Sequence, residues 1–170
     1  MKRHPALQDL SRDHHSFLMQ CRNIRWYVEH DRRASPFEVV LRGFLRTWER
    51  EVGPHLEEEE TLFVPFYQRY PSTLQAQYEE QIREDHEWLR VKVAELMRRQ
   101  EAGEPIEALL GKIGERLHDH VRFEERSVFK HVQTIMSDEA LHEIGAMSLA
   151  FREAQRPNAI GPRKEEVCEI

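Results

Sequence analysis

At 170 residues, the chain has room for one domain with a proper hydrophobic core and too little for two. Its residues are 33% charged and 39% hydrophobic with only 7 glycines, which suits a helical bundle whose outer faces are solvated. The formal net charge of −6 provides no basic surface for nucleic acid, so we expect no nucleic-acid partner.

The chain also carries no sign of a membrane or of secretion. Its longest uncharged runs, residues 61–68 and 144–151, are far too short to span a bilayer. The N-terminus lacks the apolar stretch of a secretory signal. Two cysteines, Cys21 and Cys168, make no disulfide framework and indicate free thiols in a reducing compartment. We therefore predict a cytoplasmic protein with no membrane partner.

Two helices are predicted in the first part of the chain. The first follows an apolar seam with spacings of three and four residues, at Leu7, Leu10, His14, Phe17, Cys21, Ile24 and Val28. Residues 31–36 break it, and Ser35-Pro36 is typical of the start of a second helix. The second seam is Phe44, Leu45, Trp48, Val52, His55, Glu59, Leu62 or Phe63, and Phe66. Gly53-Pro54 predicts a kink within it.

Three more helices are predicted in the second part. The third begins near Ser72 and ends at Gly103, and the fourth follows Pro105. Their seams are Tyr78, Ile82, His86, Leu89, Val93 and Leu96, then Leu110, Ile113, Leu117, His120, Glu124 and Val128. A shorter fifth helix is expected from residue 137 to about 154, followed by a mobile tail at 157–170.

Short turns between long helices make sequential neighbours antiparallel. The predicted fold class is therefore all-α: an up-down-up-down four-helix bundle with a short fifth C-terminal helix, forming one domain over residues 1–156.

One polar pattern occurs twice along these helices. Asp13-His14 is echoed by Asp85-His86, and His55-x3-Glu59 is echoed by His120-x3-Glu124. A His and a Glu four residues apart share one face of a helix. All six residues occupy seam positions that would otherwise carry Leu or Val, where burial of unpaired polar groups is costly. The repeat therefore predicts four imidazoles and two carboxylates that converge on metal.

The repeat also selects among neighbouring candidates. His15 aligns with Glu87, so we expect His15 to be solvated and His14 to point inward. Glu58 and Glu59 both lie near the face of His55, but the equivalent position of Glu58 is Phe123; Glu58 is kept as a reserve ligand. His118 is predicted on the surface or in a supporting role. Ordinary surface or hydrogen-bonded roles are expected for His4, His30, His131 and His142.

Six ligands are too many for one zinc ion and suit two metals. We expect one metal to take His14 and His55, the other to take His86 and His120, and Glu59 and Glu124 to bridge. A bridging oxo or hydroxo group would complete the centre. Mixed nitrogen and oxygen ligands with open positions favour two iron ions, with manganese or zinc as alternatives.

With these motifs the chain resembles the hemerythrin family, in the broad sense of hemerythrin-like HHE cation-binding domains. The resemblance covers roughly residues 7–132. It rests on Asp13-His14, the block from Pro54-His55 through Glu59-Glu60 to Phe63-Val64-Pro65, Asp85-His86, and His120-x3-Glu124-Glu125. It implies a four-helix bundle that holds a non-haem di-iron centre. Family members bind dioxygen, sense oxygen, iron or redox state, or respond to nitric oxide and peroxide stress.

The chain departs from the oxygen carriers of this family in two places. They have a further His one turn after the third-helix ligand, where this chain has Arg90. Their fourth-helix carboxylate is an Asp five residues after its His, where this chain has Glu125, with Glu124 at four. The set of four His and two Glu is more similar to iron-centre repair proteins and to the iron-sensing domain of an F-box protein.

The leading hypothesis is a di-iron protein that binds or senses a small molecule such as dioxygen, nitric oxide or peroxide. An apolar wall is expected around the metals, formed by Phe17, Leu62, Phe63, Leu89, Phe123 and Val128. The alternatives are a di-iron oxidoreductase, an iron-centre repair or stress-response protein, or a metal-stabilised interaction module. No residue stands out as a dedicated acid or base, so metal binding is favoured over enzymatic turnover. Tyr27 and Tyr67 are candidate redox partners, and a homodimer is left open.

Overall fold

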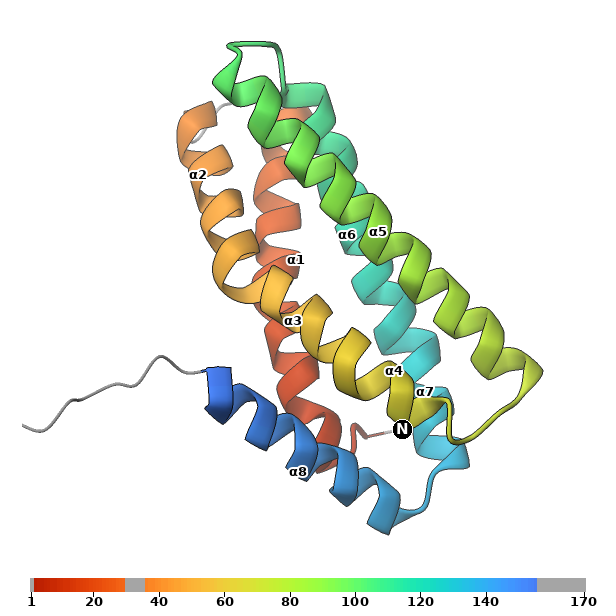
Figure 1. The fold of residues 1–170 in the computed structure, drawn as a ribbon. Coiled ribbons are helices and arrows are strands. Elements are labelled where there is room, and N and C mark those ends of the chain that lie inside the picture. The colour runs from red at the N-terminus through yellow and green to blue at the C-terminus, as the bar shows by residue number, and fades with distance from the viewer. Residues whose placement is uncertain (1, 30–35, 156–170) are drawn as a thin grey trace, which may run out of the picture.

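The computed structural model of the chain describes residues 2–29 and 36–155 (Figure 1). Within these two ranges the regular structure is entirely helical, without a strand, which confirms the predicted all-α class. The predicted tail at 157–170 lies outside the described residues, as do His30 and Cys168. No helix among the described residues is long and apolar enough to cross a membrane.

Consecutive helical segments join into four long rods. The first rod begins with the short helix η1 (Pro5–Leu7) and continues as α1 (Gln8–Glu29). The predicted seam is buried from Leu7 to Ile24, with His14 inward and His15 exposed. The seam prediction is wrong at Val28, which is 53% exposed. The position facing Val28 on a neighbouring helix is Gly111, which offers no side chain to cover it.

The second rod is helical throughout, and its α-helical hydrogen-bonding pattern is interrupted by two π-helical turns. It consists of α2 (Phe37–Thr47), η2 (Trp48–Val52), α3 (Gly53–Glu58), η3 (Glu59–Phe63) and α4 (Val64–Tyr67), with η2 and η3 π-helical. The predicted kink falls at η2, where the rod changes direction on passing from α2 into α3 (Figure 1). Pro54 has no N–H and crowds the preceding turn, and the N–H of Gly53 bonds to the Trp48 carbonyl five residues back.

The third and fourth rods follow the predicted boundaries closely. α5 (Thr73–Glu101) starts after Ser72, whose side chain accepts a hydrogen bond from the Gln75 N–H at 3.0 Å. Gly103, at φ 68°, provides the left-handed residue that follows this helix. The fourth rod contains α6 (Glu107–Phe123), the π-helical η4 (Glu124–Val128) and α7 (Phe129–Ile135).

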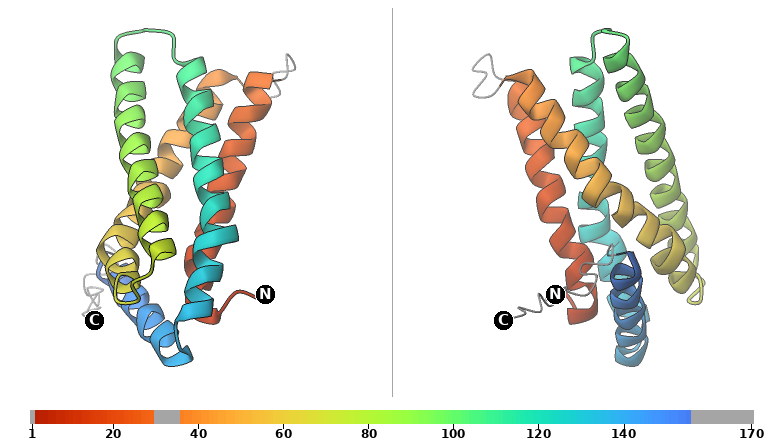
Figure 2. Two further views of the ribbon diagram at one scale, coloured as in Figure 1. Left: turned by 90° about the vertical axis from the view of Figure 1, so that its right-hand side faces the viewer. Right: turned by 60° about the vertical axis from the view of Figure 1, so that its left-hand side comes forward.

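The rods lie side by side, and the last helix crosses one end of them. α1 packs against α2 and α6, and α6 packs in turn against α5. The predicted fifth helix is α8 (Asp138–Gln155), which lies across the end of the molecule near the N-terminus and packs against η1 and η3 (Figures 1 and 2). α8 therefore covers the end of the rods at which α1 begins.

The hydrophobic core is divided into two clusters by a layer of buried polar residues. In α1, Leu10 belongs to one cluster and Phe17 to the other, and His14 stands between them. The same order occurs in α5, where His86 stands between Ile82 and Leu89. Because every rod crosses this layer, the fold itself brings the polar seam residues to one level.

Candidate metal centre

Six buried side chains from the four rods meet in the polar layer. Their side chains are 0–2% exposed. They form two groups, each with its donor atoms within 4.8 Å of one another, and both groups could hold a metal ion. The first group is His14, His55, Glu59 and Glu124, and the second is Glu59, His86, His120 and Glu124. The two groups match the division that the sequence predicts, with both glutamates shared.

Each glutamate reaches an imidazole of both groups. The two carboxylate oxygens of Glu59 lie 3.3 Å from Nε2 of His55 and 3.3 Å from Nε2 of His86. One oxygen of Glu124 lies 3.1 Å from Nε2 of His14 and 3.6 Å from Nε2 of His120. The two carboxylates therefore span the centre as bridging ligands would.

Both glutamates are also the first residue of a π-helical turn. The N–H of Val64 bonds to the Glu59 carbonyl, and the N–H of Phe129 bonds to the Glu124 carbonyl, each five residues back. Such turns insert one extra residue into the helix and rotate everything that follows. The rotation brings Phe129 into contact with the centre, where its ring stacks on His14 with centroids 5.7 Å apart. A strict 3.6-residue period misses this residue.

The opposite nitrogen of each imidazole is held by a further carboxylate outside the centre. A carboxylate can only accept, so in each neutral ring Nδ1 carries the proton and Nε2 presents its lone pair to the centre. The four Nδ1–oxygen pairs are His14–Glu125 at 2.8 Å, His55–Asp13 at 3.0 Å, His86–Glu60 at 2.9 Å and His120–Asp85 at 3.3 Å.

These outer carboxylates connect different rods. Asp13 adjoins His14 in the sequence but contacts His55, and Glu60 adjoins Glu59 but contacts His86. Sequence reasoning did not assign the outer residues this role. The repeated Asp-His and Glu-Glu pairs could have identified these carboxylates from the sequence. Which histidine each carboxylate contacts depends on how the rods pack.

Each outer carboxylate is in turn bound by an arginine. The contacts are Arg3 with Glu125, Arg152 with Asp13 at 2.7 Å, Arg90 with Glu60 at 2.5 and 3.0 Å, and Arg116 with Asp85 at 2.5 Å. Glu59 and Glu124, in contrast, have no arginine partner among the described residues.

The inner donor atoms lack hydrogen bonds within the protein. Both carboxylate oxygens of Glu59 and of Glu124, and Nε2 of His86 and His120, are buried without a hydrogen-bonding partner. Nε2 of His14 faces Nε2 of His55 at 3.2 Å, so when both rings are neutral two lone pairs oppose each other unless a metal ion lies between them. Buried polar atoms in native proteins are normally satisfied, and divalent cations would satisfy all of these at once. The donor set therefore fits a pair of metal ions.

The raised pKa values of His55 and His86 also show that positive charge is favoured at this centre. Burial lowers the pKa of His55, but the charge of Glu59 and the hydrogen bond to Asp13 outweigh burial and raise it to about 10. Burial likewise opposes protonation of His86, and the nearby carboxylates of Glu59 and Glu60 raise its pKa to about 9. Despite burial, His55 and His86 hold the pKa of Glu59 well below its usual range. Without metal, protons compensate the buried carboxylates.

The surroundings of the centre are largely apolar. Phe17 contacts the rings of both His14 and His55, with centroids 5.9 and 5.0 Å apart. Four residues of the predicted wall are fully buried: Phe17, Phe63, Leu89 and Val128. Leu62 and Phe123 are only partly buried. Phe123 packs against Tyr78, at 5.2 Å between ring centroids.

Glu58 faces away from the donor groups. It is buried beneath α8, where its carboxylate contacts Ser148 and lies 2.7 Å from Nε of Arg152. It belongs to neither group of donors, so the structure provides no support for Glu58 as a reserve ligand. Arg3 and Arg152 were not anticipated, because both lie outside the repeated part of the sequence.

A hollow of about 310 Å³ reaches the centre beside His55. It lies next to α8, with Asp13, Pro54, Phe151 and Arg152 among the residues that line it. His55 itself is 3% exposed, so this hollow touches the centre at the edge of one imidazole.

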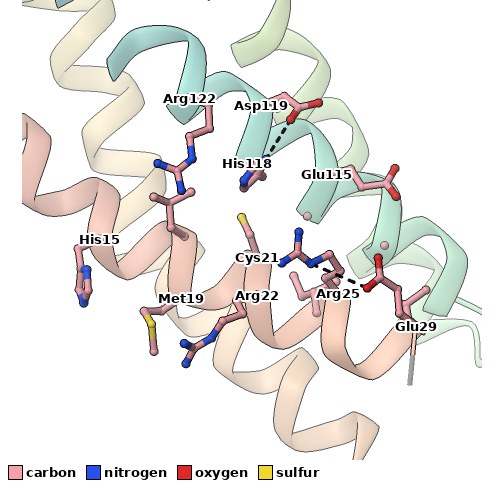
Figure 3. A pocket seen from close by; sticks show the side chains of 15 residues that line it. His15, Met19, Cys21, Arg22, Arg25, Glu29, Glu115, His118, Asp119 and Arg122 are labelled. Carbon is pink, nitrogen blue, oxygen red and sulfur yellow. Dashed lines mark hydrogen bonds and ion pairs between the residues drawn. The ribbon is translucent and has the colours of Figure 1, made fainter. Parts of the chain in front are cut away.

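A second hollow, between α1 and α6, is separate from the centre. Figure 3 shows His118 pointing into it beside Asp119, with Cys21 at its inner side. None of the six donors lines this hollow, so His118 has a surface position, as one of the predicted alternatives had it. Burial raises the pKa of the Cys21 thiol to about 12, which keeps the thiol protonated and unreactive.

The sequence was also compared with known proteins. Neither the curated proteins nor the solved structures contain a match to it. The hemerythrin HHE cation-binding domain, in contrast, matches residues 6–132, which includes all six inner donors and all but the outermost residues of the four rods. The chain therefore belongs to the hemerythrin HHE cation-binding domain family.

Proposed function

We propose that this protein holds two iron ions and uses them to bind or sense a small molecule such as dioxygen, nitric oxide or peroxide. His14 and His55 would hold one ion, His86 and His120 the other, and Glu59 and Glu124 would bridge them. The observation that carries the proposal is the set of buried carboxylate and imidazole atoms that have no hydrogen-bonding partner within the protein. Iron is favoured over zinc because six mixed nitrogen and oxygen donors suit a pair of partly filled octahedral ions.

The four rods support the predicted up-down-up-down four-helix bundle as the frame of this centre, with α8 as the fifth helix. A pair of iron ions with open coordination positions supplies reversible redox chemistry and a place for a small ligand to bind. The protein's own residues orient the imidazoles through the outer carboxylates and exclude water with Phe17, Phe63 and Phe129. The hollow beside His55 is the proposed approach for the ligand. We propose a cytoplasmic location for this activity.

Metal analysis combined with absorption spectroscopy tests the proposal. The purified or iron-reconstituted protein should contain close to two irons per chain and absorb in the near ultraviolet as a coupled ferric pair does. Reduction should bleach this absorption, and exposure to air, nitric oxide or peroxide should change it. A protein that stays colourless and metal-free after reconstitution with iron would overturn the proposal.

A di-iron oxidoreductase is the second candidate. It is favoured by Arg90, which pairs with Glu60 where the oxygen carriers place a fifth histidine, so the ion held by His86 and His120 would keep a more open coordination position. Steady consumption of peroxide or nitric oxide by the iron form, abolished in His86→Ala, would separate turnover from binding. Binding without consumption would leave the sensing role.

A further inference from the structure

A third cluster of side chains that could bind a metal lies between the N-terminal segment and α8. His4, Asp138 and His142 offer donor atoms within 4.8 Å of one another. All three lie outside residues 6–132, the part that matches the family. The sequence predicted ordinary roles for both histidines, because His4 and Asp138 are 134 residues apart and only the fold brings them together.

The geometry of the cluster suits a single small cation. Asp138 lies between the two histidines: its Oδ1 is 3.0 Å from Nε2 of His4, and its Oδ2 is 3.3 Å from Nε2 of His142. Tetrahedral zinc, with bonds of roughly 2.0–2.1 Å, places its ligand atoms roughly 3.3 Å apart. Asp138 and His142 are four residues apart on one face of α8, so both can turn toward the same point.

The cluster is both anchored and open to solvent. The side chain of His4 is 14% exposed, and its backbone N–H donates to Gln133 at 3.2 Å, which fixes its position. Asp138 and His142 are 72% and 64% exposed, so a cation can reach them directly. The partly buried histidine provides a fixed ligand, and the two exposed residues provide ligands that can adjust.

We propose that His4, Asp138 and His142 form a second metal site that binds one zinc ion or a similar divalent transition metal, with water completing its coordination. Two imidazoles and one carboxylate are an ordinary zinc donor set when the fourth position stays open. The bound ion ties the N-terminal segment to the first turns of α8. Arg3, the residue before His4, pairs with Glu125, which in turn holds His14. A metal ion bound to His4 would therefore also help to fix the position of Arg3 beside the six-residue centre.

Binding at this site has a recognisable local cost. Nδ1 of His4 accepts a hydrogen bond from the Ala6 N–H at 3.2 Å, which leaves the ring proton on Nε2. Zinc at Nε2 requires that proton to move to Nδ1, so the Ala6 N–H loses its acceptor. This cost makes the site weaker than a closed structural zinc site, and it gives the Ala6 amide a diagnostic response.

The test is the number of zinc ions bound by the full chain, measured by titration calorimetry and metal analysis after the metal content of each preparation is known. Native protein is compared with His142→Ala, Asp138→Asn and the control His118→Ala. His118 is a matched control because it is also a surface histidine beside an aspartate, at 3.0 Å, without a second histidine in its cluster. His118→Ala should bind as native protein does, whereas the other two variants should lose one zinc, with affinity reduced by at least about tenfold.

This comparison does not depend on the proposed di-iron function, because the six-residue centre is identical in all four proteins. His142 is exposed, so its replacement should leave the fold intact. Zinc should also slow amide exchange in the first turns of α8 and shift the Ala6 amide resonance in native protein but not in His142→Ala. Equal zinc binding by native protein and His142→Ala would overturn the proposal, as would an Ala6 amide that does not respond.

Discussion

The two halves of the centre present the same inner donors but are supported in different ways. Around His86 and His120, the supporting arginines are local: Arg90 follows His86 by four residues, and Arg116 precedes His120 by four. Around His14 and His55, the arginines come from the ends of the described chain, Arg3 from the N-terminal segment and Arg152 from α8.

This difference separates what a repeat can specify from what packing adds. One half draws its histidines, carboxylates and arginines from the rods alone, and its two arginines lie on the same helices as its two histidines. The other half is complete only when α8 and the N-terminal segment lie over the end of the rods. We therefore expect substitutions in the N-terminal segment or in α8 to affect the half with His14 and His55 more than the half with His86 and His120.

The largest effect is expected where the halves meet. Glu59 contacts one imidazole in each half, so Glu59→Gln should lose both metals rather than one. The exposed neighbour Glu57 provides the control, and Glu57→Gln should keep the native metal content. Metal analysis after reconstitution, with circular dichroism to confirm folding, measures the outcome. Retention of one full equivalent in Glu59→Gln would show two independent sites.

The next effect is the pH dependence of the stability of the metal-free protein. His55 and His86 have folded pKa values of about 10 and about 9, above the ordinary value of 6.5. Protonation therefore favours the folded state fully below pH 6.5, and this contribution is lost as pH rises through 9 to 10. Urea unfolding with a chelator should show stability that falls across this window, and bound metal should remove the fall.

The two halves should be distinguishable in the same experiment. His55→Gln should remove the upper part of the pH window, because the remaining residue, His86, loses its proton nearer pH 9. His86→Gln should leave the fall that extends toward pH 10. Identical profiles for both variants would contradict the assigned pKa order.

A smaller effect should separate distant from local support. Arg152 is 27% exposed and binds both Asp13 and the nearly buried Glu58, so Arg152→Ala should cost roughly 1–3 kcal/mol of unfolding free energy. The pair of Arg90 and Glu60 is 41% and 38% exposed, and Arg90→Ala should cost less than about 1 kcal/mol. Denaturant unfolding of both variants measures the difference. A larger loss in Arg90→Ala would reverse the comparison.

The smallest effect is expected at the neighbour of an inner donor. His15 is exposed beside the buried His14, so His15→Ala should change stability by less than about 0.5 kcal/mol and leave the metal content unchanged. His14→Ala should lose metal from its own half. Thermal unfolding and metal analysis of the pair check the predicted register of α1, and a loss of metal in His15→Ala would refute that register.

Much of the fold could be predicted because the helices are long and their apolar residues periodic. Ser72, Gly103 and residues 137–138 marked helix ends correctly through local backbone chemistry. The inner histidines and glutamates could be selected because polar residues on a buried seam need a reason to be there. Val28 and Phe129 were misjudged or missed because their burial depends on a glycine of another helix and on a π turn.

The sequence by itself determined the all-helical class, the seam of each rod and the six polar residues on those seams, since these follow from local periodicity. Only the tertiary structure decided which outer carboxylate holds which imidazole, and that Arg3 and Arg152 complete one half of the centre. It also decided that His4 meets Asp138 and His142. These contacts join residues more than 100 positions apart or on different rods, and their pairing depends on how the rods and α8 pack, which no local pattern encodes.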